Sequence, residues 1–272
     1  MSSAFFLPAE PGKRFCIYHS SADGGTGRGF VYAHPFCDEM NKARRMAALQ
    51  SRRLAAAGYA VLQIDLFGCG DSSGDFSDAS WEIWKKDLQT ALAWLKSRVS
   101  GPSGLWGLRL GAMLAADVAR DPIMGIEQLL LWQPVSDGEQ FLTQFLRLRL
   151  AAEMLAEGTA QTGVRELRET LSRGVPLEIA GYELHPRLAA EIDALKLAEL
   201  TPAVKRVICL EVTAAAEPKL SPASQRTLQA WRSKGLDVRA AAVRGEPFWS
   251  TIELTECEAL LGATEGSLKG AY

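Results

Sequence analysis

The sequence predicts an α/β fold in which helices cover both faces of a mostly parallel central sheet. Short apolar runs alternate with amphipathic stretches along most of the chain, which is the order produced when each strand is followed by a crossover helix. One apolar run ends in a glycine-flanked turn, Gly107-Leu108-Arg109-Leu110-Gly111, that leads directly into a helix start. The 272 residues, 47% of them hydrophobic, suit one large domain of roughly 250 residues with an insertion.

The first half of the chain carries the clearest pattern. Gly58 is expected to end the first helix, because glycine readily adopts the left-handed conformation found after a helix. Ser80 is expected to cap the second helix, whose apolar residues, Trp81 and Trp84 among them, recur at helical spacing and so belong to the core. The expected strands are 14–19, 29–33, 60–65, 105–108 and 129–132, and the expected helices are 42–57, 81–95 and 110–120.

Residues 137–200 interrupt this order and look mainly helical. We therefore divide the chain into a first core part at 1–136, a helical cap insertion at 137–200 and a second core part at 201–272. The elements expected after residue 137, apart from the helices of the insertion, are strands at 177–179, 204–212 and 238–243, a helix at 223–234 and a last helix within 249–268.

The helix expected at 141–155 carries an unusually wide apolar arc. Two apolar stripes lie side by side on it, and an arc of that width must be buried on more than one side. A cap that closes over a pocket would bury it, and so would an interface in a homodimer or with another subunit. The first stripe is Phe141, Phe145, Leu148, Ala152 and Leu155, and the second is Leu142, Leu146, Leu150 and Met154.

Charge and cysteine usage argue against several classes of function. Thirty basic residues against 32 acidic ones give a net charge of −2, so no basic surplus indicates a nucleic acid or an anionic membrane as partner. The five cysteines are odd in number, scattered and without metal-ligand spacing, which favours reduced thiols in a cytoplasm and no metal site. We expect no signal peptide, no membrane span and no cofactor.

The glycine-flanked turn has the form of the nucleophile elbow of α/β-hydrolases. In the pattern G-x-S-x-G, a sharp turn between a strand and a helix exposes a serine hydroxyl at the top of the sheet. Here that position holds Arg109, whose guanidinium stays protonated and has no lone pair with which to attack a carbonyl. The sequence therefore predicts the α/β-hydrolase fold with the sharp turn kept and the nucleophile missing.

Two loops of the expected fold precede the elbow. His34-Pro35-Phe36 resembles the oxyanion loop that follows an early strand. Proline has no N–H, so any backbone donor there must come from Phe36 or Cys37. The stretch 65–74 resembles the D-x-x-G-x-G-x-S loop after the next strand, and we expect it to be structural because neither of its last two serines lies on an elbow.

The acid and the base of a Ser-His-acid triad should follow the later strands. Glu217 stands where the acid is expected. The base should follow the last strand, but Glu246 lies there and no histidine follows His185. Two of the three triad members are thus missing at their expected positions, and the mechanism needs both.

Several stretches form a distinctive set: His34-Pro35-Phe36, Glu39-Met40-Asn41, Asp65-Leu66, residues 68–74, residues 106–111, residues 180–184 and residues 245–249. Together they resemble the second type of exosortase A system-associated hydrolase, and the resemblance spans nearly the whole chain. Its most specific part is the arginine elbow combined with Gly-Glu-Pro-Phe-Trp. The resemblance implies a cytoplasmic bacterial protein linked to exopolysaccharide production and to the sorting of proteins to the cell surface.

Arg109 has two possible roles at this place. A helix N-terminus offers free N–H groups and a positive dipole, so an added guanidinium would attract a carboxylate, a phosphate or the phosphopantetheine arm of an acyl carrier protein. Alternatively, Arg109 forms a buried ion pair with Glu217 or Glu246 that fills the space of the lost triad. The candidate ligand-binding residues are His34, Phe36, Cys37, Arg109, Leu110, Glu217 and Glu246.

The leading interpretation is a protein with a degenerate triad that binds a small acyl or anionic ligand, or a partner such as a related serine hydrolase. The alternative is an active esterase, thioesterase or acyltransferase with a non-standard site. In that case His34 would activate the Cys37 thiol, or two carboxylates among Asp38, Glu217 and Glu246 would share a proton and activate water.

Overall fold

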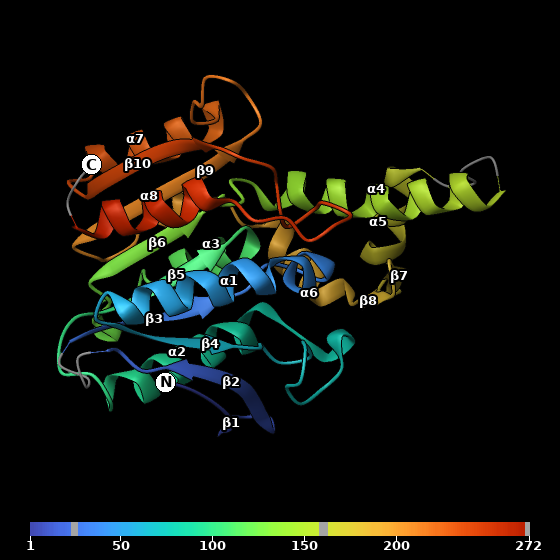
Figure 1. Cartoon of the computed structure of the whole chain (residues 1–272). Helices are drawn as coiled ribbons and strands as arrows, with labels where there is room; N and C mark the ends of the chain where they lie inside the picture. The colour runs from blue at the N-terminus through green and yellow to red at the C-terminus, as the bar shows by residue number, and fades with distance from the viewer. Residues whose placement is uncertain (23–26, 158–162, 270–272) are drawn as a thin grey trace.

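The computed structural model describes residues 1–22, 27–157 and 163–269. Its centre is an eight-stranded sheet in the order β1-β2-β4-β3-β5-β6-β9-β10, with helices on both faces (Figure 1). The two pairings of β2 are antiparallel and the other pairings in this sheet are parallel, as the sequence predicts. The strands are β1 (Ser2–Pro8), β2 (Lys13–His19), β3 (Arg28–Ala33), β4 (Tyr59–Ile64), β5 (Ser103–Leu108), β6 (Gln128–Trp132), β9 (Arg206–Thr213) and β10 (Asp237–Arg244).

Two layers of helices bury the sheet. Leu129 and Leu131 of β6 pack into the apolar cluster that contains α2, α3 and α7, whereas Leu130 and Trp132 pack into the cluster with α1 and α8. A parallel strand covered on both faces must be apolar at successive positions, which explains the continuous run 129–132. The helices of these layers are α1 (Asp38–Ala56), α2 (Trp81–Lys96), α3 (Leu110–Val118), α7 (Pro222–Ser233) and α8 (Glu258–Lys269).

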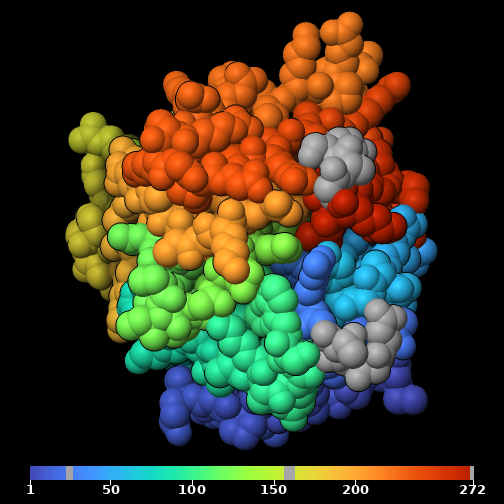
Figure 2. Space-filling model, turned by 90° about the vertical axis from the view of Figure 1, so that its left-hand side faces the viewer, coloured from blue at the N-terminus to red at the C-terminus, as the bar shows by residue number. Residues whose placement is uncertain are grey.

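Chain order follows the sheet across the molecule. Figure 2 views the molecule from the side opposite α4 (Gly138–Glu157) and α5 (Val164–Ser172). The N-terminal strands (blue) lie at one end and the C-terminal elements (orange and red) at the other, with the middle of the chain between them. Strand β1 is an edge strand that the sequence did not predict, because most of its side chains face solvent and leave no clear alternation.

Two local predictions about helix ends are confirmed. The Ser80 side chain accepts a hydrogen bond from the N–H of Ile83 at 3.3 Å, so Ser80 caps α2. Gly58, the second residue after the end of α1, has a φ of 87°. The start of α1 was predicted wrongly: the helix begins at Asp38 and not near residue 42, which places two acidic residues in its first turn.

The chain leaves the sheet between β6 and β9 and returns at nearly the same point. The N–H of Gly138 donates to the carbonyl of Leu195 at 2.9 Å, and the N–H of Leu197 donates to that of Ser136 at 3.0 Å. A Cβ atom at Gly138 would lie 1.8 Å from the carbonyl oxygen of Ile192, so only glycine fits there. The elements between are α4 (Gly138–Glu157), α5 (Val164–Ser172), the hairpin β7 (Leu177–Ile179) and β8 (Tyr182–Leu184), and α6 (Pro186–Asp193).

The apolar arc of α4 is buried at one end of the helix and exposed at the other. Leu142 and Leu146 are 1% and 0% exposed, but Leu148, Met154 and Leu155 are 52%, 58% and 89% exposed. Burial of the second half of the arc in a subunit interface thus stays a prediction, and the chain by itself buries only the first half. The reason is geometric, because the second half of α4 extends past the body of the molecule (Figure 1).

A buried ion pair fixes the loop that follows β4. Arg14 Nε lies 2.7 Å from Asp87 Oδ1, and the two side chains are 0% and 1% exposed. The other oxygen of Asp87 accepts the N–H of Phe67 at 2.8 Å. Within the same loop the Ser72 hydroxyl donates to the carbonyl of Asp65 at 2.5 Å, so this serine holds backbone, as predicted for the stretch 65–74.

Replacing Asp87 by alanine is expected to lower the free energy of unfolding by about 3–5 kcal/mol, because it leaves a buried guanidinium unpaired. Urea denaturation measures the change. The double variant Arg14→Met/Asp87→Leu is expected to recover most of the loss, and Asp237→Ala, in an exposed ion pair with Arg206, is expected to cost less than about 1 kcal/mol. Equal stability of Asp87→Ala and the unchanged protein would contradict the prediction.

Candidate functional site

The predicted elbow is present at the carboxyl end of β5. Arg109 joins β5 to α3 with φ 56° and ψ −119°, a strained region that few residues other than glycine adopt. The turn is held by close packing: a Cβ atom at Gly107 would lie 2.5 Å from the backbone of Ala112, and one at Gly111 would lie 2.4 Å from the carbonyl oxygen of Ala33. Both flanking glycines are therefore required by space, as in the G-x-S-x-G pattern.

Arg109 lines a cleft of about 610 Å³ that lies between the carboxyl end of β5 and α4. One wall is apolar and comes from the stripe of α4 that the sequence identified. The opposite wall comes from the first turn of α1 and from the loop after β10. The lining residues are Phe36, Cys37, Asp38, Glu39, Lys42, Arg109, Phe141, Gln144, Phe145, Leu148, Ala151, Ala152, Leu155, Ala180, Trp249 and Ser250.

The ion-pair partner of Arg109 is Glu39. Arg109 Nε lies 3.2 Å from Glu39 Oε1, with side chains 18% and 21% exposed. The predicted partners were wrong, because the loops that carry them turn outward. Glu217 is 84% exposed and pairs with Lys219, and Glu246 is exposed and outside the cleft.

Glu39 is the residue that sequence reasoning missed. It lay in the motif Glu39-Met40-Asn41, but the helix was expected to start later, which hid the fact that its first turn faces the elbow. Burial raises the pKa of the Glu39 carboxyl, and the Arg109 guanidinium draws that pKa part of the way back. Glu39 Oε2 is buried without a hydrogen-bond partner among the described residues.

Two aromatic rings flank the guanidinium of Arg109. Its Cζ lies 5.6 Å from the ring centroid of Trp249 and 5.9 Å from that of Phe141. Trp249 follows β10, where the base of a triad is expected, and it is 6% exposed. Cation–π contact and a carboxylate thus stabilise a charge that burial alone would penalise.

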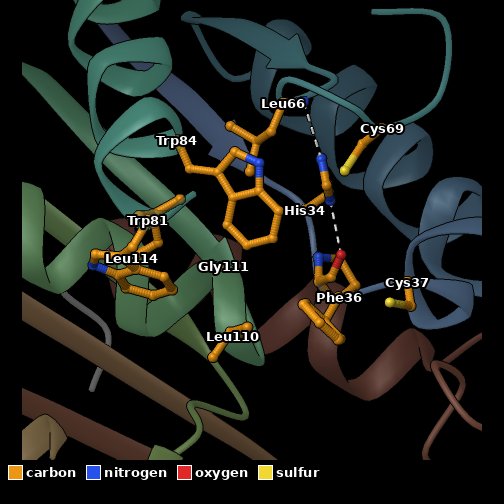
Figure 3. Close-up of a pocket in the computed structure, with 11 residues that line it drawn as sticks. His34, Phe36, Cys37, Leu66, Cys69, Trp81, Trp84, Leu110, Gly111 and Leu114 are labelled. Atoms are coloured by element: carbon orange, nitrogen blue, oxygen red, sulfur yellow. Dashed lines mark hydrogen bonds between the residues drawn. The ribbon is translucent and has the colours of Figure 1, made fainter. Parts of the chain in front are cut away.

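His34 lines a second, small cavity that shares Phe36 and Cys37 with the cleft, and Figure 3 shows its ring beside the backbone of Leu66. Its Nδ1 lies 2.7 Å from the carbonyl oxygen of Pro35, and its Nε2 accepts the N–H of Leu66 at 3.1 Å. A carbonyl can only accept, so the proton is on Nδ1 and neither nitrogen is free. Burial lowers the pKa of His34, which keeps the ring neutral. Leu110, another predicted site residue, lines the same small cavity.

Phe36 and Cys37 line both the small cavity and the cleft. Burial raises the pKa of the Cys37 thiol well above its usual value, so the thiolate is scarce at neutral pH. The predicted Cys37–His34 dyad is not formed, because both ring nitrogens already bond backbone. Cys37 itself has a φ of 50° at the start of α1, a second strained turn beside the elbow.

The comparisons with known proteins define the class by fold. No family model matches the chain. It is similar to Est1E from Butyrivibrio proteoclasticus bound to ferulic acid, with a TM-score of 0.75 and 14% identity over 98% of both chains. It is also similar to a monoglyceride lipase from Saccharomyces cerevisiae in complex with a substrate analogue, with a TM-score of 0.68 and 15% identity over 100% of this chain and 94% of that one. The protein has the α/β-hydrolase fold.

One curated protein shares a stretch of sequence with it. An acyl transferase from Shewanella woodyi is 39% identical over 82 residues, which are 29% of this chain and 27% of that protein. The shared stretch thus spans about a quarter of the relative's length. Within the described residues, no helix is long and apolar enough to cross a bilayer, and no group of three or more His, Cys, Asp or Glu side chains is arranged to hold a metal ion.

The strain at the elbow predicts an inverted order of stability. Arg109→Gly is expected to be more stable than Arg109→Ala by about 1 kcal/mol or more, because both lose the same side chain but only glycine is relaxed at this φ. At Lys86, an exposed residue in the middle of α2, the glycine variant is expected to be the less stable by about 1 kcal/mol. Thermal denaturation of the four variants decides it, and an alanine more stable than glycine at both sites would contradict it.

Proposed function

We propose that this protein binds a small acyl or anionic ligand in the cleft beneath α4 and performs no serine-type hydrolysis. The observation that carries the proposal is Arg109 at the elbow, directly open to a cleft with an apolar wall. The cation takes the position at which a hydrolase presents its nucleophile, and it offers hydrogen-bond donors in place of an attacking oxygen.

The shape of the cleft supports an acyl ligand. Its volume of about 610 Å³ falls within the range of small-molecule sites. Phe141, Phe145 and Leu148 supply an apolar wall against which a hydrocarbon chain can pack, and Arg109 with Glu39 makes another part of the cleft polar. A chain that carries a polar head matches this gradient from apolar to charged surface.

The surrounding groups argue against triad chemistry. Trp249 occupies the cleft after β10 and cannot accept a proton. His34 is neutral and fully hydrogen-bonded, and burial keeps the Cys37 thiol protonated. None of these three residues is therefore suited to act as the base or the nucleophile of a triad.

A second candidate function is turnover of esters or thioesters, or acyl transfer, by an unusual site. The 82-residue match to an acyl transferase favours it. Such an enzyme would keep the sharp turn at Cys37 as an oxyanion donor and would use Glu39 or Asp38, which line the cleft, as a base.

The resemblance to exosortase A system-associated hydrolases supports a cytoplasmic location for the protein and a role for its ligand binding in exopolysaccharide production. An acyl carrier protein or a related serine hydrolase is then the partner that we propose. Co-purification of this protein with such a hydrolase after the two are co-expressed tests this part of the proposal.

Ala152→Trp is expected to weaken acyl binding at least about tenfold, because the indole fills the cleft from the wall of α4. Calorimetry with S-octanoyl-N-acetylcysteamine and with octanoate measures affinity for an uncharged and a charged acyl compound. Ala190→Trp on the exposed face of α6 is the matched control and is expected to bind like the unchanged protein. If the unchanged protein binds neither compound, or Ala152→Trp binds both as well as the control, the site is elsewhere.

A fluorophosphonate probe is expected to leave the protein unlabelled, and aryl esters and acyl thioesters are expected to remain intact, since no activated serine stands at the elbow. Mass spectrometry of the protein detects labelling by the probe, and release of the alcohol or thiol product detects cleavage of the esters and thioesters. Turnover that disappears in Cys37→Ala or Glu39→Gln would favour the second candidate function instead.

A further inference from the structure

The charges that line the cleft balance one another. The charged lining residues are Arg109, Lys42, Glu39 and Asp38. Arg109 pairs with Glu39 at 3.2 Å, and Lys42 Nζ lies 3.0 Å from Asp38 Oδ2. Each cation thus already has its own carboxylate, and the cleft holds no surplus positive charge for a ligand to neutralise.

Arg109 nevertheless keeps hydrogen-bond donors to offer. Only its Nε bonds Glu39, and within the described part of the chain its Nη1 and Nη2 make no hydrogen bond. A carbonyl oxygen can accept from these nitrogens without adding charge. A carboxylate would accept equally well but would bring a second negative charge beside Glu39, where partial burial weakens screening.

We infer that the cleft selects uncharged acyl compounds, such as esters or thioesters, over free carboxylic acids, and that Glu39 is the residue that determines this specificity. The inference rests on the proposed function and narrows its ligand class. Glu39 rejects the free acid by its charge, while Arg109 positions the carbonyl of the uncharged ligand. The charges of Lys42 and Asp38 cancel in their ion pair, so this pair adds no preference for an anion.

The test compares two ligands that share one hydrocarbon chain. The unchanged protein is expected to bind S-octanoyl-N-acetylcysteamine at least about tenfold more tightly than octanoate in calorimetry. Glu39→Gln keeps the shape and an acceptor for Arg109 Nε but removes the charge, so it is expected to tighten octanoate binding and to narrow the ratio to about threefold or less. Glu82→Gln, 59% exposed on α2, is the control and is expected to leave the ratio unchanged.

Asp38→Asn gives an independent reading if Glu39→Gln folds poorly. Its side chain is 54% exposed, so the fold tolerates the change, and the ratio is expected to shift in the same direction by a smaller factor. Octanoate bound as tightly as the thioester by the unchanged protein overturns the inference, as does a ratio that neither variant moves. Both results leave acyl binding itself intact, whereas binding of neither ligand contradicts the proposed function.

Discussion

The close backbone packing around the elbow is the constraint on which the site depends. Gly111 lies against the carbonyl of Ala33 at the end of β3, and the N–H of Arg109 donates to the carbonyl of Trp132 at the end of β6 at 3.0 Å. The carbonyl of Arg109 in turn accepts the N–H of Val135 at 3.3 Å, on the segment that leads into α4. One strained residue therefore fixes the ends of neighbouring strands and the start of the cleft wall. The strain, on the order of 1–3 kcal/mol, persists because these contacts leave no room for a relaxed turn.

Placing a cation at this turn has an electrostatic cost that the neighbours offset. The N-terminus of α3 is the positive end of the helix dipole, which disfavours a guanidinium. Glu39, in the first turn of α1, lies at the positive end of another helix, where a carboxylate is favoured. The pair thus joins two helix N-termini with the negative partner on α1 and the positive one at α3, and the rings of Trp249 and Phe141 lie close to the guanidinium.

Much of the fold was predictable, and much of the site was not. Glycines at 107 and 111, the Ser80 cap and the apolar run at β6 follow from local rules, because turn geometry and burial on two faces leave direct marks on sequence. The partner of Arg109 depends instead on which residues of a distant helix face the turn. An error of four residues at the start of α1 was enough to hide Glu39. Glu217 and Glu246 were chosen by their order along the chain, and loop direction, which sequence does not record, carries both into solvent.

Hydrogen bonds join the two ends of the segment between β6 and β9, and this bears on how that segment can vary. Gly138 packs against Ile192, and one hydrogen bond from Gly138 to Leu195 and one from Leu197 to Ser136 hold the two ends of this segment together. Strands β6 and β9 also pair directly with each other. The pairing of the central sheet therefore does not depend on the segment between these two ends. A change in length between these two ends leaves the pairing of β6 with β9 in place, and with it the strand end that bonds the Arg109 turn.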